Sequence, residues 1–171
     1  MRTQTGSSQV FLVALAAAVA FIWLTSRGLP PVVASHFGAS GAADGFMPRG
    51  GYAWFMTALA AVVPSLLVFL PERALRHPKA RINLPHRDYW LAPERREATI
   101  DHLCANARRM GYWLIAFLVY VHWLVVEANR TTPPTLDSTW FIAGLVGFAL
   151  GMLMSIVGIF RRFGRLPTRD R

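Results

Sequence analysis

The chain of 171 residues is poor in charged side chains and has a single cysteine. Charged residues make up 16% of it, against about a quarter in soluble domains, and hydrophobic residues make up 54%. This composition excludes intrinsic disorder, which requires low hydrophobicity. The lone Cys104 excludes an internal disulfide and the zinc or iron–sulfur sites that need several thiolates. We expect no metal and no cofactor.

Acidic residues are scarce as well: nine Asp and Glu stand against 18 Lys and Arg, a formal net charge of +9. A basic excess of this kind is typical of proteins that bind nucleic acid or an anionic membrane surface. No stretch combines basic and aromatic residues as nucleic-acid-binding modules do, so we expect no nucleic-acid partner. The partner that the charge fits is the lipid bilayer.

Apolar residues gather in four long segments whose central parts lack charged side chains. A membrane-spanning helix needs about 20 such residues. With a turn added at polar flanks, the spans are predicted at 8–26, 52–70, 110–128 and 140–160. The predicted fold class is therefore an all-α integral membrane protein, with four transmembrane helices in one domain over 1–171. The alternative, a soluble helical bundle, is disfavoured by four such segments in so short a chain.

Basic residues are spread unevenly over the loops. The two tails and the loop at 71–109 share one side and contain 15 of the 18 Lys and Arg, whereas the loops at 26–51 and 127–139 contain three. The positive-inside rule assigns the richer side to the cytoplasm, so both termini are expected there. In a second interpretation the first segment is a cleaved signal peptide, with Val33-Ala34-Ser35 as the cleavage site.

Small residues recur every four positions in the fourth segment, starting at Ala143. In lipid, a face of small residues lets helices approach closely. We expect a helix-packing surface at Gly147, Gly151 and Ser155, against another span or a second copy of the chain.

The predicted outer loop contains a candidate site for a ligand or partner. Prolines lead into a short β-like run, and Asp44-Gly45 is a common turn dipeptide. His36 and Asp44 are expected to converge across this turn; alternatively, Asp44 caps the turn and His36 packs against Phe37 or the bilayer surface. The predicted contact residues are His36, Phe37, Gly41, Asp44 and Gly45.

A second candidate lies in the loop at 71–109, where aromatic residues, prolines and charges alternate. Such a segment can seat aromatic rings in lipid while arginines meet phosphates, or it can dock a protein partner in the membrane or cytoplasm. Proline at a first helical position followed by Glu predicts a helix from Pro93 into the third span. The predicted contact residues are Asn83, Pro85, Tyr89, Trp90, Pro93, Glu94, Arg95 and Arg96.

Both candidate stretches resemble a bacterial membrane protein family of unknown function, whose domain also forms the N-terminal part of SdpI-type immunity proteins. Residues 36–45 are similar to its H-F-N-x-x-G-x-x-D-G loop, with Gly38 where the family usually has Asn. Residues 83–96 are similar to its N-L-P-x-x-x-Y-W-L-A-P-E-R run. The 171 residues are too few for the further spans of full SdpI-type proteins. The resemblance implies a bacterial inner-membrane protein without an established enzyme activity.

Three classes of function follow. The leading one is a non-enzymatic module that senses, binds or sequesters a partner, in the manner of an immunity protein. A small transporter or channel component is the second, and it requires polar residues inside the spans. His122 is the ionisable residue there, a functional candidate or an interhelical hydrogen-bonding group. The third is a membrane enzyme that uses His36 and Asp44 and needs a further catalytic group.

Overall fold

The structure is a computed structural model and describes residues 2–166. Arg169 and Arg171, which the charge count includes, lie outside the described residues. Four helices are long and apolar enough to cross a membrane. In chain order the elements are α1 (Arg2–Ser26), β1 (Val32–Phe37), β2 (Ala43–Pro48), α2 (Arg49–Arg76), α3 (Arg87–Trp90), α4 (Pro93–Ala128) and α5 (Ser138–Phe163).

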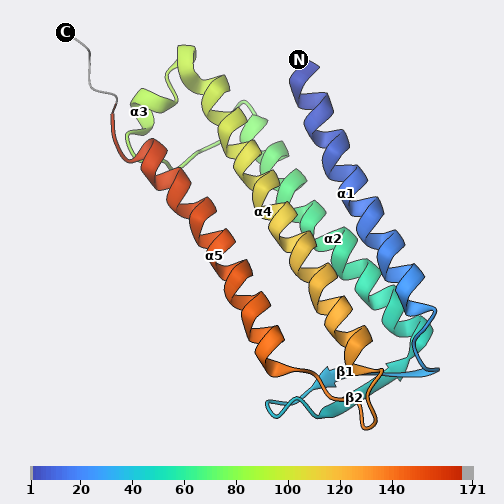
Figure 1. Ribbon diagram of the computed structural model, residues 1–171. Helices are drawn as coiled ribbons and strands as arrows, with labels where there is room; N and C mark the ends of the chain where they lie inside the picture. The colour runs from blue at the N-terminus through green and yellow to red at the C-terminus, as the bar shows by residue number, and fades with distance from the viewer. Residues whose placement is uncertain (1, 167–171) are drawn as a thin grey trace.

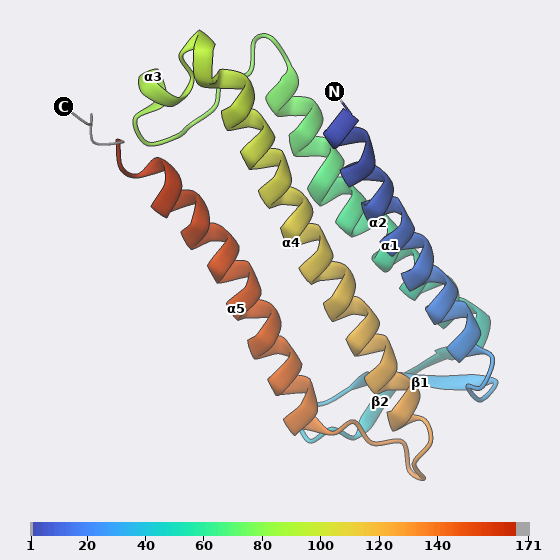
Figure 2. The ribbon, with the colours of Figure 1, turned by 45° about the horizontal axis from the view of Figure 1, so that its top comes forward.

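Helix α4 occupies the centre of the bundle and packs against α1, α2 and α5 (Figure 1). The start of α1, the end of α5 and the short α3 are at the same end of the bundle, which we call the α3 end. The strands β1 and β2 and the loop 129–137 lie at the opposite end, the hairpin end (Figure 2). The two loops that are poor in basic residues are therefore together at the hairpin end.

The helices bury a narrow interior and expose apolar side chains on the outside. One buried cluster near the hairpin end includes Ile22, Tyr52 and Val125, and a second one midway along the bundle includes Phe11 and Val68. On the outer surface many large aliphatic side chains are more than half exposed, among them Leu12, Leu66 and Leu153. An apolar exterior is compatible with helices that face lipid.

The predicted helix that starts at Pro93 and continues into the third span is confirmed, because α4 runs unbroken from Pro93 to Ala128. Proline suits the first helical position because its missing N–H has no intrahelical acceptor there. The buried residues Ile100, Cys104 and Arg108 recur every four residues along one face. This face extends the contact between α2 and α4 into the α3 end.

Two of the three predicted packing residues of α5, Gly151 and Ser155, lie on its buried face, and Gly147 does not. A Cβ atom at Gly151 would lie 2.5 Å from the Trp113 ring of α4, and one at Gly144 would overlap Tyr120. Ser155 is buried, but a Cβ at Gly147 would have no neighbour within 4 Å. Steps of four residues drift around a helix of 3.6 residues per turn, so not every member of such a stripe reaches one neighbour.

Candidate functional site

The hairpin covers the end of the helix bundle. Strand β1 pairs antiparallel with β2, and Val33 on β1 is fully buried in the cluster that contains Ile22 and Tyr52. The predicted β-like run is therefore confirmed, and the candidate cleavage stretch Val33-Ala34-Ser35 lies inside a strand. The predicted turn at Asp44-Gly45 is wrong, because both residues belong to β2. The turn occupies residues 38–42, where Gly41 takes the left-handed conformation with φ 81°.

His36 and Asp44 converge, as the sequence predicts. The His36 Nδ1 atom lies 2.5 Å from Asp44 Oδ1. The register is irregular here: His36 pairs with Gly45, Phe37 pairs with Ala43, and Asp44 is the extra residue between them. A Cβ at Gly45 would lie 2.8 Å from that of His36, so glycine permits this close approach. The two side chains are 75% and 53% exposed, which leaves the pair open to a ligand.

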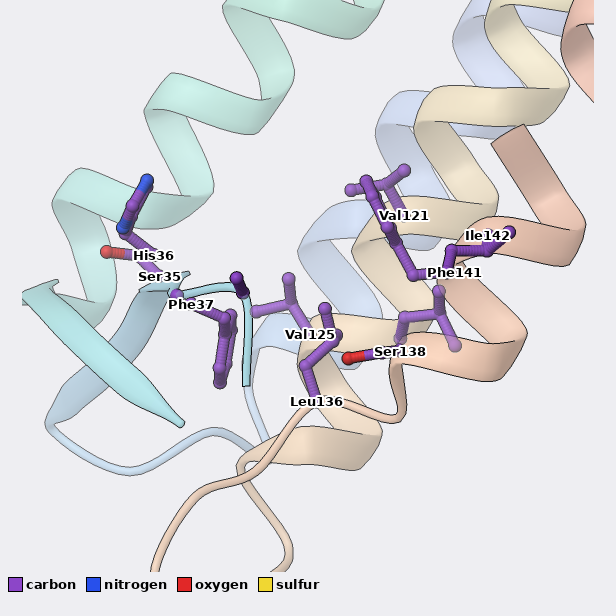
Figure 3. Close-up of a pocket in the computed structure, with 12 residues that line it drawn as sticks. Ser35, His36, Phe37, Val121, Val125, Leu136, Ser138, Phe141 and Ile142 are labelled. Atoms are coloured by element: carbon purple, nitrogen blue, oxygen red, sulfur yellow. The ribbon is translucent and has the colours of Figure 1, made fainter. Parts of the chain in front are cut away.

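A cavity of about 420 Å³ opens beside this pair (Figure 3). Figure 3 shows His36 of β1 on one side and Phe141 of α5 on the other, with Val125 of α4 between them. The volume lies in the range of about 300–1,000 Å³ typical of ligand pockets. Apart from Ser35, His36 and Ser138, the lining side chains are apolar: Phe37, Ala39, Val121, Leu124, Val125, Leu136, Phe141 and Ile142.

The hairpin is fixed to the bundle by Asn129, which follows α4 directly. Its Oδ1 accepts a hydrogen bond from the Ala34 N–H at 2.8 Å, and its Nδ2 donates to the Ala34 carbonyl at 2.9 Å. At the turn, the Leu136 N–H donates to the Gly41 carbonyl at 2.8 Å. Asn129 was not among the predicted site residues, although a carboxamide directly after a predicted span is a common capping residue. These contacts hold Phe37 in place as a wall of the cavity.

His122 joins three helices inside the bundle. Its ring is fully buried, with Nε2 2.7 Å from Thr25 Oγ1 and Nδ1 2.8 Å from Tyr52 Oη. Thr25 Oγ1 also lies 2.7 Å from the Phe21 carbonyl, which can only accept, so the hydroxyl donates there. Thr25 then accepts from Nε2–H, and the Tyr52 hydroxyl donates to Nδ1. Of the two interpretations, the interhelical hydrogen bond is the one that these contacts support.

A family model for a domain of unknown function, DUF1648, matches residues 11–61. The match covers most of α1, the whole hairpin and the first part of α2, and it includes His36 and Asp44. The α4 and α5 walls of the cavity lie outside the DUF1648 match. Searches of curated proteins and of solved structures give no match.

The second candidate stretch, residues 83–96, also lies outside the DUF1648 match. Some of its aromatic and basic side chains make contacts within the chain. Trp90 Nε1 donates to the Phe163 carbonyl at the end of α5 at 3.2 Å, and the two rings pack edge to face at 5.2 Å. The Arg95 guanidinium lies 4.0 Å from the centre of the Tyr89 ring. Trp90 is therefore held by α5 rather than free to enter lipid. The exposed members of the set are Asn83, Pro85, Pro93 and Glu94, and Arg96 is half-buried.

Sequence analysis missed an ionic contact between α2 and α4 at the α3 end. Arg108 is 8% exposed, and its Nη1 lies 3.4 Å from Glu72 Oε2. One turn away, Arg76 Nη2 lies 2.8 Å from Asp101 Oδ1. The signal was available, since Arg108 continues the four-residue spacing of Ile100 and Cys104. Part of the basic charge at this end is thus neutralised within the bundle.

Proposed function

We propose that the chain is a multi-pass protein of the bacterial inner membrane with both termini in the cytoplasm. Four membrane-length apolar helices support the membrane location. Within residues 2–166, the end that contains the start of α1 and the end of α5 has 13 of the 16 basic residues, which supports the orientation. The hairpin end then lies on the outer face of the membrane, where it is accessible to molecules outside the cell.

The proposed activity is non-catalytic binding of a partner at the hairpin end. The observation that carries it is the apolar cavity whose lining includes His36, the histidine of the exposed His36–Asp44 pair. This combination fits an apolar side chain of a polypeptide with a charged or polar neighbour, since the cavity desolvates the first and the pair hydrogen-bonds to the second. The resemblance of the loop to SdpI-type immunity proteins favours a membrane-active peptide as the partner.

Binding is preferred to catalysis because, in the part of the chain that the structure describes, the His36–Asp44 pair has no hydrogen-bonded nucleophile. The neighbouring Ser35 hydroxyl donates to the Gly45 carbonyl at 3.4 Å. Within residues 8–166, no Ser, Thr or Cys side chain is hydrogen-bonded to the His36 ring. A nucleophilic mechanism needs such a group next to the base.

Site-specific photocrosslinking in native membranes tests the binding site. A photoreactive phenylalanine analogue at Phe141 lines the cavity, and the same analogue at Val146 is the matched control, because Val146 is an exposed α5 residue that does not line the cavity. We expect a discrete polypeptide adduct from position 141 alone, which the cavity-filling variant Ala39→Trp abolishes, since Ala39 is an exposed residue of the lining. Polypeptide adducts of equal yield from both positions, or lipid adducts alone, would contradict the proposed site.

The orientation needs separate cysteine labelling, and Cys104 itself is unsuitable. Its side chain is 1% exposed, so it resists a maleimide on either side of the membrane. In a Cys104→Ser background, Ser40→Cys reports the hairpin end and His86→Cys reports the α3 end; both positions are exposed. In intact cells we expect an impermeant maleimide to label position 40 and to reach position 86 only after permeabilisation. The reverse pattern would contradict the orientation.

A further inference from the structure

A second cavity, also of about 420 Å³, lies at the α3 end. Leu67 of α2, Met110 of α4 and Ile159 of α5 form part of its apolar wall, and the segment 81–84 closes one side. The predicted spans 52–70, 110–128 and 140–160 all end at this level. The cavity therefore lies where the hydrocarbon of a bilayer meets the headgroups, the depth at which an amphiphilic molecule has its polar group next to its apolar part.

A buried carboxamide faces this cavity without a strong partner. Asn106 lines it and is 2% exposed. Among the described residues, the one hydrogen-bond partner of its side chain is the Met110 sulfur, 3.6 Å from Nδ2, and a thioether is a weak acceptor. Buried amides are nearly always hydrogen-bonded, because leaving one unpaired is costly. The amide therefore points to an occupant that has a polar group at this depth.

A positive charge stands at the same cavity. Arg81 belongs to the lining, its side chain is exposed, and within residues 8–166 it forms no ion pair. The neighbouring Arg76 and Arg108, in contrast, are paired with carboxylates. An occupant with an anionic group would form an ion pair with Arg81 and neutralise its charge.

We propose that this cavity is a binding site for one anionic phospholipid of the leaflet at the α3 end. An acyl chain lies along the apolar wall, an ester or glycerol oxygen accepts a hydrogen bond from Asn106, and the phosphate lies near Arg81. The site requires the proposed membrane location. It is independent of partner binding at the hairpin end, so the two proposals can fail separately.

The test measures thermal unfolding of the purified full chain in detergent, with phosphatidylglycerol or phosphatidylcholine of identical acyl chains added. We expect phosphatidylglycerol to bind more tightly and to raise the unfolding temperature more. Arg81→Gln should reduce this preference about fivefold, the effect of one basic residue near an anionic headgroup. Arg87→Gln is the matched control: this exposed arginine of α3 does not line the cavity, and its loss should leave the preference unchanged.

Asn106→Leu separates a lipid contact from a structural role. Leucine keeps the volume and removes the unpaired amide, so without lipid the unfolding temperature should stay level or rise. Both lipids should bind more weakly, because the ester and glycerol oxygens that Asn106 contacts are common to the two. Equal effects of the two lipids on the wild-type chain, or equal losses in Arg81→Gln and Arg87→Gln, would overturn the proposal. So would an Asn106→Leu variant that is less stable without lipid and binds both lipids as tightly as the wild-type chain.

Discussion

Both ends of the bundle combine polar or charged side chains with apolar or aromatic ones, but these side chains make different contacts at the two ends. At the hairpin end, His36 and Asp44 pair with each other on the surface beside an apolar cavity. At the α3 end, Trp90 and Arg95 turn toward their own chain and fasten α3 to α5 and to the start of α4. Exposed polar groups beside an unfilled apolar wall indicate recognition, whereas inward aromatic and basic groups indicate assembly. Substitutions at Trp90 and Arg95 should therefore affect stability first, and substitutions at His36 and Asp44 should affect binding first.

The largest loss of stability is expected from Trp90→Ala. This change removes the hydrogen bond to the Phe163 carbonyl and the ring contact with Phe163, which is itself fully buried. Replacing a packed tryptophan by alanine costs about 3 kcal/mol. Chemical unfolding in detergent measures it, with Trp140→Ala as control, because the Trp140 side chain is 59% exposed. Equal losses from the two variants would mean that Trp90 does not fasten α5.

Asn129→Ala should cost about 2 kcal/mol, because it leaves the N–H and the carbonyl of the buried Ala34 without their side-chain partner. The same unfolding measurement applies. This variant separates the hairpin end from the α3 end. Asn129→Ala should reduce both stability and the crosslinking yield at Phe141, whereas Trp90→Ala should reduce stability alone. A normal crosslinking yield in Asn129→Ala would show that the hairpin keeps its place without the carboxamide.

The helices could be predicted from the sequence because a membrane-length apolar run is a local signal. The approach of His36 to Asp44 was also predictable, since a hairpin brings residues eight positions apart together. The turn was misplaced, because Asp44-Gly45 is a good turn dipeptide in isolation but tertiary contacts of Gly41 with the loop 129–137 select the register. Asn129 and Asn106 escaped notice because their importance arises from what lies opposite them in the bundle. The α4 and α5 walls of the hairpin-end cavity come from residues 85 to 106 positions away from His36 in the chain.

Helix α5 contributes residues to the lining of both cavities. Substitutions at two of its glycines, Gly151 and Gly147, test how it packs against α4. Gly151→Ala should destabilise the chain by about 1–2 kcal/mol, because the new methyl group would lie against the Trp113 ring and force it to move. Gly147→Ala meets nothing within the described chain and removes backbone freedom from the unfolded state, so it should be neutral or slightly stabilising. Thermal unfolding of the two variants in detergent provides the comparison. A loss at Gly147 that equals the one at Gly151 would indicate that a second copy of the chain packs on that face.

The smallest effect on stability, and the sharpest on function, is expected from His36→Ala and Asp44→Asn. Exposed side-chain pairs of this kind contribute less than about 1 kcal/mol, so both variants should unfold close to the wild-type chain and accumulate normally in membranes. Both should nevertheless lose most of the polypeptide crosslink at Phe141, because the polar contact at the cavity rim is gone. The double variant should lose no more than either single one, since the two residues act as one unit. Reduced membrane abundance with an unchanged yield per molecule would instead make the pair a structural feature of the hairpin, and the distinction between the two ends would disappear.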